Sequence, residues 1–259
     1  MIGFFIKKSF FDGWDNLFSL VLCNLVHIVL IVLFILLPIS CGAGQTLTMV
    51  LVAIGVVLMS IWQSVCTFAM TEVSDYRSVG LKATFAALRV AWKPGLWMGL
   101  VAVALLYSLF FGIPFYFSQK SPVGIFAGVM LFWFSIGVLL ASQYYLALVA
   151  RLGGGFKKNM KKAFILTFDN MGFSFMLLLC NLVCAVISVF SFFLAPGFAG
   201  IALGCADALK LRLKKYDWLE ANPSADRRHI PWDELLEEEK ELVGKRSLKG
   251  MIFPWKDEK

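Results

Sequence analysis

Six polar side chains interrupt long apolar stretches of the sequence, and their chemistry is the first candidate for a function. Polar groups are costly in hydrocarbon, so each is a candidate site residue by default. If the six side chains face one common axis, they line a polar path through the bundle. If they lie in separate places, they make hydrogen bonds between helices, and this second interpretation is the favoured one. His27 could also transfer a proton. Asp207 is expected either to be solvated near the interface or to pair with Lys210, three residues later in the same helix. The six are Asn24, His27, Gln63, Gln143, Asn181 and Asp207.

Motifs of established catalytic sites are absent from the sequence. It contains no H-E-x-x-H zinc motif, no G-x-S-x-G nucleophile motif and no phosphate-binding P-loop. The cysteines form no C-x-x-C pair, which argues against a metal site and a disulfide framework. The spacing Gly95-x-x-x-Gly99 is a small-residue ridge that favours close helix packing. We therefore expect neither enzyme activity nor a cofactor.

The composition indicates which elements must position these residues. The 259-residue chain is 59% hydrophobic and 16% charged, whereas soluble domains have about 25% charged residues. Several apolar runs exceed the roughly 18 residues that mark a membrane span. These values exclude a soluble globular domain, a disordered chain, a collagen-like chain and a secreted disulfide scaffold. The expected fold class is an all-α, polytopic membrane protein embedded in a lipid bilayer.

Hydropathy divides the chain into a transmembrane domain over residues 1–215 and a cytoplasmic tail over 216–259. The tail is expected to hold a short acidic helix and to end in a basic and aromatic segment. The last of six predicted spans is short, and charged residues occupy its final third, where long basic side chains can reach the interface. The predicted spans cover residues 17–38, 47–70, 95–117, 123–150, 172–194 and 197–213.

The distribution of charge predicts the orientation of the chain. The net charge is +7, but residues 216–259 are net acidic, so the positive excess belongs to residues 1–215. Basic residues cluster at the N-terminus, between spans two and three, between spans four and five, and after span six. The positive-inside rule then places both termini in the cytoplasm. Because this rule accounts for the basic clusters, we expect no nucleic-acid binding. The first apolar run is too long for a cleaved signal peptide and is expected to remain as an anchor.

A weak internal repeat runs through the sequence. The run KKSF at residues 7–10 precedes CNLV at 23–26, and KKAF at 161–164 precedes CNLV at 180–183. A fainter copy begins with KATF at 82–85. We expect three parallel repeats, each an amphipathic interfacial helix followed by two spans.

The segment that leads each repeat is amphipathic. In the first, Ile6, Phe10 and Trp14 lie opposite Lys8 and Asp12. Such helices lie in the headgroup plane, with aromatic side chains in lipid and basic side chains facing anionic headgroups. A docking platform for a cytoplasmic partner is the alternative, and the end of the tail is either a membrane strap or a partner-binding peptide. The candidate contact residues are Lys82, Arg89, Lys93, Lys157, Lys158, Lys161, Lys162, Trp232, Phe253 and Trp255.

The motif Phe85-x-x-Leu88-x-x-x-Trp92-Lys93-x-Gly95, which leads into a span, resembles the bacterial YesL family of integral membrane proteins. Residues 145–152 with 158–164, and the stretch 24–38, are similar to the same family. The resemblance extends over residues 10–215 and leaves out the tail. It implies a protein of the bacterial cytoplasmic membrane that assists carbohydrate uptake by an ABC transporter, and it supplies no catalytic residues.

These observations predict a non-enzymatic accessory or scaffold subunit of a transport system. Its partners would be the permease or ATPase subunits of a carbohydrate ABC importer, contacted through the cytoplasmic face and the tail. One alternative is an autonomous small-solute transporter or channel, which requires the intramembrane polar residues to converge. A second alternative is a membrane-embedded lipid enzyme, which requires a wet cavity that joins His27 to an acid or a serine.

Overall fold

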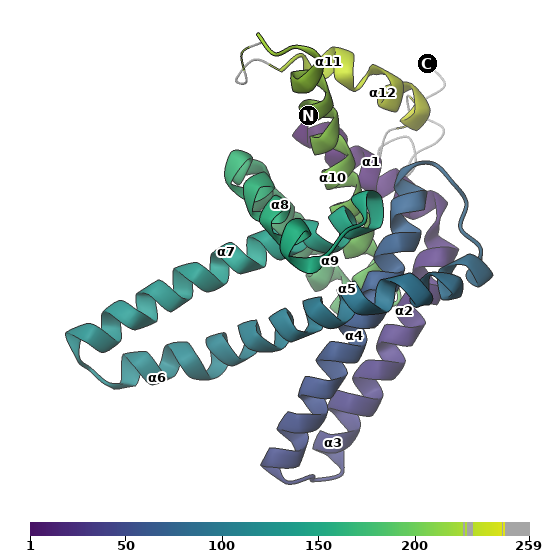
Figure 1. Ribbon diagram of the computed structural model, residues 1–259. Helices are drawn as coiled ribbons and strands as arrows, with labels where there is room; N and C mark the ends of the chain where they lie inside the picture. Colours follow the sequence, from purple (N-terminus) through teal and green to yellow (C-terminus); the bar gives the residue numbers. More distant parts are fainter. Residues whose placement is uncertain (225, 227–229, 245, 247–259) are drawn as a thin grey trace.

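The structure is a computed structural model that describes residues 1–224, 226, 230–244 and 246, and its regular elements over those residues are all helical (Figure 1). Two short π-helical turns, η1 and η2, interrupt the longer helices. The elements are α1 (Ile2–Asp15), α2 (Leu17–Ile31), η1 (Val32–Leu36), α3 (Leu37–Ser40), α4 (Gln45–Ser74), α5 (Leu81–Tyr107), η2 (Ser108–Gly112), α6 (Ile113–Ser118), α7 (Pro122–Leu152), α8 (Phe156–Asp169), α9 (Met171–Phe190), α10 (Gly197–Ala221), α11 (Trp232–Leu235) and α12 (Glu237–Val243).

Five helical stretches are long and apolar enough to cross a membrane, and they coincide with the first five predicted spans. Large apolar side chains on these helices face outward: Phe110, Phe126 and Phe190 are exposed. An exposed apolar surface of this extent is stable only in contact with lipid or another apolar surface. The molecule is therefore an all-helical, multi-pass membrane protein. The five stretches are Leu17–Ser40, Gln45–Ser74, Leu81–Ser118, Pro122–Leu152 and Met171–Phe190.

The sixth predicted span, over residues 197–213, stays a prediction. These residues belong to α10, which is not among the helices that are apolar enough to cross a membrane. The cause is its position: α10 contacts α1, α2, α4, α7 and α9, so its surface is covered by protein rather than lipid. Small residues such as Ala199, Ala202 and Ala206 allow this close approach, and they are almost completely buried. The predicted domain boundary between residues 215 and 216 falls inside this helix.

Two helical hairpins project away from each other in Figure 1, one formed by α2, α3 and α4 and the other by α5, α6 and α7. In both, the first arm contains a π turn next to a proline, Pro38 after η1 and Pro114 after η2. Proline has no N–H and its ring collides with the carbonyl one turn earlier, and a wider turn relieves that collision. The hairpins meet where α4 packs on α5. A Cβ atom at Gly95 would lie 2.5 Å from Ile61 Cα, which confirms the predicted close packing.

Two of the three predicted interfacial helices are separate elements, and one is not. Helices α1 and α8 each have 14 residues and each end at an asparagine, Asn16 and Asn170. Both asparagines donate their side-chain N–H to the carbonyl four residues earlier, at 2.9 Å and 3.1 Å. The middle segment instead continues through Pro94 into the span as one helix, α5. Its tight contact with α4 holds the helix together there, and the threefold repeat stays a prediction.

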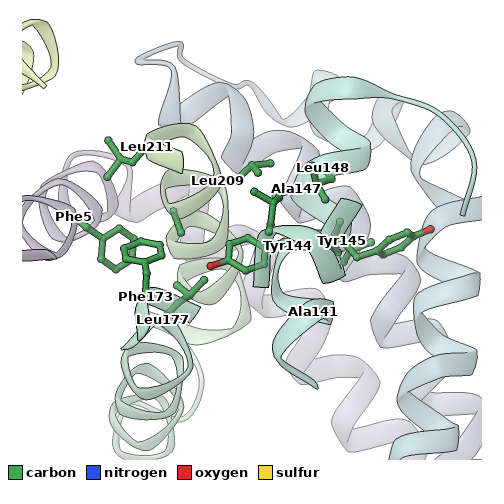
Figure 2. Packing of buried hydrophobic residues seen from close by; sticks show 14 of the residues in the cluster. Phe5, Ala141, Tyr144, Tyr145, Ala147, Leu148, Phe173, Leu177, Leu209 and Leu211 are labelled. Atoms are coloured by element: carbon green, nitrogen blue, oxygen red, sulfur yellow. The ribbon is translucent and has the colours of Figure 1, made fainter. Parts of the chain in front are cut away.

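The main core joins the membrane helices to α1 and to the tail at Leu236. Figure 2 shows Phe5 of α1 beside Phe173 of α9, and Tyr144 of α7 directed toward Leu177. The rings of Phe5 and Phe173 meet edge to face with centroids 5.5 Å apart. Leu236, which links α11 to α12, is buried in the same core. The first part of the tail therefore packs as an integral part of the helical bundle.

Candidate functional site

Three of the six predicted polar residues converge on one cavity between the helices. Gln63 comes from α4, Gln143 from α7 and Asn181 from α9. The cavity has a volume of about 290 Å³ and is also lined by residues of α5 and α10. We refer to it as the amide cavity. The other three predicted residues lie elsewhere, so the full convergence that an autonomous transport path requires is not observed.

Hydrogen bonds to main-chain carbonyls fix the orientation of the amide groups in the amide cavity. Gln143 Nε2 donates to the carbonyls of Leu140 and Ser174, both at 3.3 Å. Its Oε1 atom accepts a hydrogen bond of 2.9 Å from Asn181 Nδ2. Gln63 Nε2 donates to the carbonyl of Phe198 at 3.0 Å, but Gln63 Oε1 is buried without a hydrogen-bond partner. This oxygen has no accessible surface, and the Gln63 side chain neighbours the buried His27 ring.

Asn24 has a structural role rather than a place in the cavity. Its Nδ2 atom donates to the carbonyls of Leu194 and Pro196, at 3.0 Å and 2.9 Å. Its Oδ1 atom accepts the main-chain N–H of Ala199 at 2.9 Å, in the first turn of α10. The side chain thus satisfies free main-chain groups at the start of the central helix. Although Asn24 and Asn181 occupy matching positions in the predicted repeat, they make different contacts.

His27 is fully buried beside the same helix start. Its ring is stacked on Phe198 with centroids 4.7 Å apart, and Nδ1 lies 3.3 Å from the carbonyl of Cys23. Nε2 has no hydrogen-bond partner, although the Gln63 side chain is a neighbour of the ring. Among the described residues, no hydrogen bond or ion pair connects His27 to an acid or a serine. A catalytic pairing of His27 of the kind that a lipid enzyme requires is not observed there.

Asp207 belongs to a second site, a buried cluster of charged side chains near the ends of α1, α4, α7, α10 and α12. Solvation or pairing with Lys210 is the wrong prediction for it: Asp207 is completely buried and contacts Lys8 Nζ at 3.5 Å and Ser9 Oγ at 2.9 Å. The cause is that α1 folds back over α10 and supplies a closer cation. We call this site the ionic cluster. Its members are Lys8, Asp12, Asp75, Arg151, Asp207, Lys210, Lys214 and Glu239.

Lys8 is the centre of the ionic cluster and has no exposed surface. Its ammonium group donates to Asp12, one turn away on α1, and to the carbonyl of Ser74 at 3.0 Å. The ring of Tyr76 covers it at 4.0 Å from the ring centroid. Ser74 is the last residue of α4, so the lysine also neutralises the partial negative charge at that helix end. The buried cation thus makes two hydrogen bonds, and its remaining surroundings include the carboxylate of Asp207 at 3.5 Å.

Glu239 connects the tail helix α12 to the same cluster. Its carboxylate lies 2.9 Å from Lys210 Nζ and 3.3 Å from Lys214 Nζ, and it accepts a hydrogen bond of 2.8 Å from the Tyr76 hydroxyl. Lys210 also reaches Asp75 at 3.3 Å. Two lysines of α10 and the Tyr76 hydroxyl, which follows α4, thus bind the Glu239 side chain of α12.

Asp75 and Arg151 close the cluster at the ends of α4 and α7. The guanidinium donates from both terminal nitrogens to the two carboxylate oxygens, at 3.0 Å and 2.9 Å. Such bidentate pairs fix geometry as well as charge. The cluster as defined contains four basic and four acidic side chains.

Burial and neighbouring charges change the pKa values of these groups in different directions. Burial, together with the nearby carboxylate of Asp207, raises the pKa of Asp12 to about 7. Burial alone would raise the pKa of Glu239, but Lys210 and the Tyr76 hydroxyl stabilise the carboxylate more strongly, so the pKa is lowered. For Asp75, burial again acts upward, and Arg151 and Lys210 lower the pKa below its usual value. The pKa of Asp12 therefore lies near neutral pH, whereas the pKa values of Asp75 and Glu239 lie below their usual range.

The orientation predicted for α1 is wrong in one respect. Its apolar side chains Ile6, Phe10 and Trp14 are exposed, as a lipid-facing surface requires, but Lys8 and Asp12 face inward and are buried. They face the acidic and basic residues of α10 and α12, which the amphipathic pattern of α1 alone does not reveal. The spacing of four between Lys8 and Asp12 was the available signal for their ion pair.

The predicted basic contact residues lie on α5 and α8, away from the ionic cluster. Among the described residues, none of them forms an ion pair, and all are exposed except the half-buried Lys162. The guanidinium carbon of Arg212 lies over the indole ring of Trp232, 5.3 Å from the ring centroid, so Trp232 packs on the bundle. Phe253 and Trp255 lie outside the described residues. The basic contacts are Lys82, Arg89, Lys93, Lys157, Lys158, Lys161 and Lys162.

The fold and its two sites define the class as an integral, multi-pass helical membrane protein with a tail packed on one end of the bundle. Comparisons with protein-family models, with curated proteins and with solved structures give no match.

Proposed function

We propose that this protein is a non-enzymatic accessory or scaffold subunit of a bacterial membrane transport system, most consistent with carbohydrate uptake by an ABC importer. The observation that carries the proposal is the ionic cluster. It uses eight ionisable side chains to hold five helices in one arrangement, and each member forms an ion pair with another. Charged groups that are paired with one another and largely buried support a structural role.

The ionic cluster also fixes the tail helix α12 beside α1, and these two helices form the surface that a partner would contact. Glu239 anchors α12, Val243 of the same helix is buried, and Lys7 Nζ donates to the carbonyl of Gly244 at 2.9 Å. The tail and α1 thus form one continuous surface at the end predicted to be cytoplasmic. A preformed surface lowers the entropic cost of binding a partner, because its segments need no further ordering.

Exposed basic residues supply a feature that a partner could recognise. Lys157, Lys158 and Lys161 project from α8 without an acidic partner among the described residues. Unpaired surface charge steers association with an acidic surface and sets partner choice. The resemblance to the YesL family is the reason for proposing an ABC importer, and carbohydrate as its substrate, rather than another acidic partner.

The test is affinity purification of the full chain from native membranes in a mild detergent, followed by mass spectrometry. We expect an ATPase and a permease at near-stoichiometric yield, and reduced carbohydrate uptake after deletion of the gene. The double substitution Lys158→Glu and Lys161→Glu should lower the yield of both subunits at least several-fold. Lys120→Glu is the matched control, because Lys120 is exposed on a loop predicted to lie on the other side of the membrane.

A second pair of variants tests the role of the packed tail. Glu239→Gln removes the charge that anchors α12, whereas Glu238→Gln changes a neighbouring side chain that is 79% exposed. Partner recovery should fall for the first and stay unchanged for the second. Purification of the wild-type chain without a partner, together with unchanged uptake after deletion, would overturn the proposal.

A further inference from the structure

Helix α5, which continues through η2 into α6 as the first arm of its hairpin (Figure 1), is part of a stretch longer than a membrane span requires. The stretch Leu81–Ser118 has 38 residues, which corresponds to about 57 Å of helix, whereas the hydrocarbon core of a bilayer is about 30 Å thick. Even a strongly tilted helix of this length extends beyond the hydrocarbon. Because the predicted span begins at residue 95, the preceding turns of α5 lie at the level of the headgroups and beyond.

One face of these turns carries basic side chains. Lys82, Arg89 and Lys93 follow one another at spacings of seven and four residues, which places them on the same side of the helix. All three side chains are exposed, and none forms an ion pair among the described residues. The opposite side of the helix, with Ala91 and Gly95, is buried against α4. The basic face therefore points away from the bundle.

The sequence on either side of this face has no acidic residue. Between Asp75 and Asp169 there is no aspartate or glutamate, and this interval contains all of α5, α6 and α7, and α8 up to its last residue. The start of α8, with its own lysines, lies beside α5, because the ring of Phe156 is stacked on that of Trp97 with centroids 5.3 Å apart. The helices at this surface thus offer only positive charge, which complements an anionic partner.

The basic face of α5 passes directly into an apolar face of the same helix. Leu96 and Leu100 follow Lys93 at spacings of three and seven residues, and Leu100 is 48% exposed on the surface that faces lipid. Trp92 and Trp97, both exposed, flank the transition, and indole rings are typical of the boundary between headgroups and hydrocarbon. A phospholipid has the same order of parts, an anionic headgroup followed by apolar chains. A soluble acidic protein would match the basic part alone.

We propose that the outward face of α5 binds an anionic phospholipid, whose phosphate contacts Arg89 and Lys93 and whose acyl chain lies along Leu96 and Leu100. Side chains four residues apart on a helix have their Cβ atoms about 5–6 Å from each other, so both cations can reach one phosphate group. The guanidinium can donate two parallel hydrogen bonds to phosphate oxygens, and the ammonium adds a second positive charge. The site uses residues of α5 alone, so it is independent of the ionic cluster and of the proposed accessory function.

The experiment is photo-cross-linking of the purified full chain in nanodiscs of phosphatidylcholine. Two probes carry the same diazirine-bearing acyl chain, one on phosphatidylglycerol and the other on phosphatidylcholine, and chymotryptic peptides are mapped by mass spectrometry. We expect cross-links to residues 92–100 at a several-fold higher yield from the anionic probe. High salt should reduce this preference, because the headgroup contact is electrostatic. No other protein is present, so the result does not depend on a transporter partner.

Variants localise the headgroup contact. Arg89→Gln and Lys93→Gln should each lower the yield from the anionic probe about fivefold, the effect of one basic residue at an anionic surface, and the double variant should lower it to the yield from phosphatidylcholine. Lys120→Gln is the matched control, because Lys120 is an exposed basic residue at the far end of the same hairpin, and it should leave the yield unchanged. All three positions are exposed, so the melting temperature should not change. An anionic preference that persists in the double variant would overturn the proposal. Equal yields from the two probes would overturn it in favour of an acidic protein partner.

Discussion

The ionic cluster and the amide cavity both place polar groups inside an apolar bundle, but they treat those groups in opposite ways. In the ionic cluster, Lys8, Asp207 and Glu239 are almost fully buried, and each contacts at least one opposite charge. In the amide cavity, the groups are neutral, and Gln63 Oε1 is left without a partner. Burying an unpaired charge costs far more than burying an unpaired amide oxygen. A helical membrane protein can therefore bury an amide oxygen without a hydrogen-bond partner at modest cost, whereas its buried charges must be paired with one another.

The largest expected effect comes from removing the centre of the ionic cluster. Lys8→Met should lower the free energy of unfolding by about 3–5 kcal/mol, because Asp12 and Asp207 lose the cation that compensates them. The measurement is reversible unfolding in mixed detergent micelles. Lys82→Met is the control, since Lys82 is exposed and has no ion-pair partner among the described residues, and it should change stability by less than about 0.5 kcal/mol. A loss below about 1 kcal/mol for Lys8→Met would remove the contrast between the two sites.

The next effect is a pH dependence that only the ionic cluster should show. The pKa of Asp12 is about 7 in the folded protein, against about 4 when unfolded, so the folded state binds more protons between these values. Stability should therefore fall as the pH rises from 4 to 7, by up to about 4 kcal/mol. The pKa values of Asp75 and Glu239 are lowered, so their contributions change only at the acidic end of this range.

Asp12→Asn supplies the test of that assignment. An asparagine has no carboxyl group to ionise, so the variant should show little change in the free energy of unfolding between pH 5 and 7. Asp15→Asn, at the exposed end of α1, is the matched control and should keep the wild-type profile. The same profile in wild type and Asp12→Asn would assign the titration to another group.

The positions of the membrane helices could be predicted from the sequence because hydropathy is a local property. A run such as residues 47–70 is apolar whatever surrounds it, and its helix is found at Gln45–Ser74. The matching runs KKSF at 7–10 and KKAF at 161–164 lie in the two separate helices α1 and α8. The predicted span over residues 197–213 lies within α10, and its hydropathy is lower because alanine and glycine replace large apolar residues in a helix covered by protein.

The candidate sites were predictable in residue type but not in arrangement. Gln63, Gln143 and Asn181 were singled out as polar residues in apolar runs, yet their sharing of one cavity depends on how α4, α7 and α9 pack. The burial of Lys8 was missed because the inward face of an amphipathic helix depends on what lies opposite. The residues that lie opposite Lys8 are Asp207 and Glu239, which are more than 190 residues away in the chain.

A smaller effect is expected from the hydrogen bond within the amide cavity. Asn181→Leu should lower the free energy of unfolding by only about 1 kcal/mol, because hydrogen bonds between membrane helices average about 0.6 kcal/mol. A double-mutant cycle with Gln143→Leu isolates the pairwise contribution, which should lie near that average. A coupling as large as the loss in Lys8→Met would mean that the cavity amides are structural in the same sense as the buried charges.

The smallest effect should come from the ion pair between Arg77 and Glu72, and it separates charge from burial as the cause of the contrast. The nitrogen and oxygen lie 3.1 Å apart, closer than Lys8 and Asp207, but the side chains are 70% and 48% exposed. Water and salt screen such a pair, so its contribution should not exceed about 0.5 kcal/mol. Arg77→Ala in the unfolding assay, at low and high salt, measures it. A loss comparable to that of Lys8→Met would show that proximity of charges, rather than their removal from water, determines the stability of the ionic cluster.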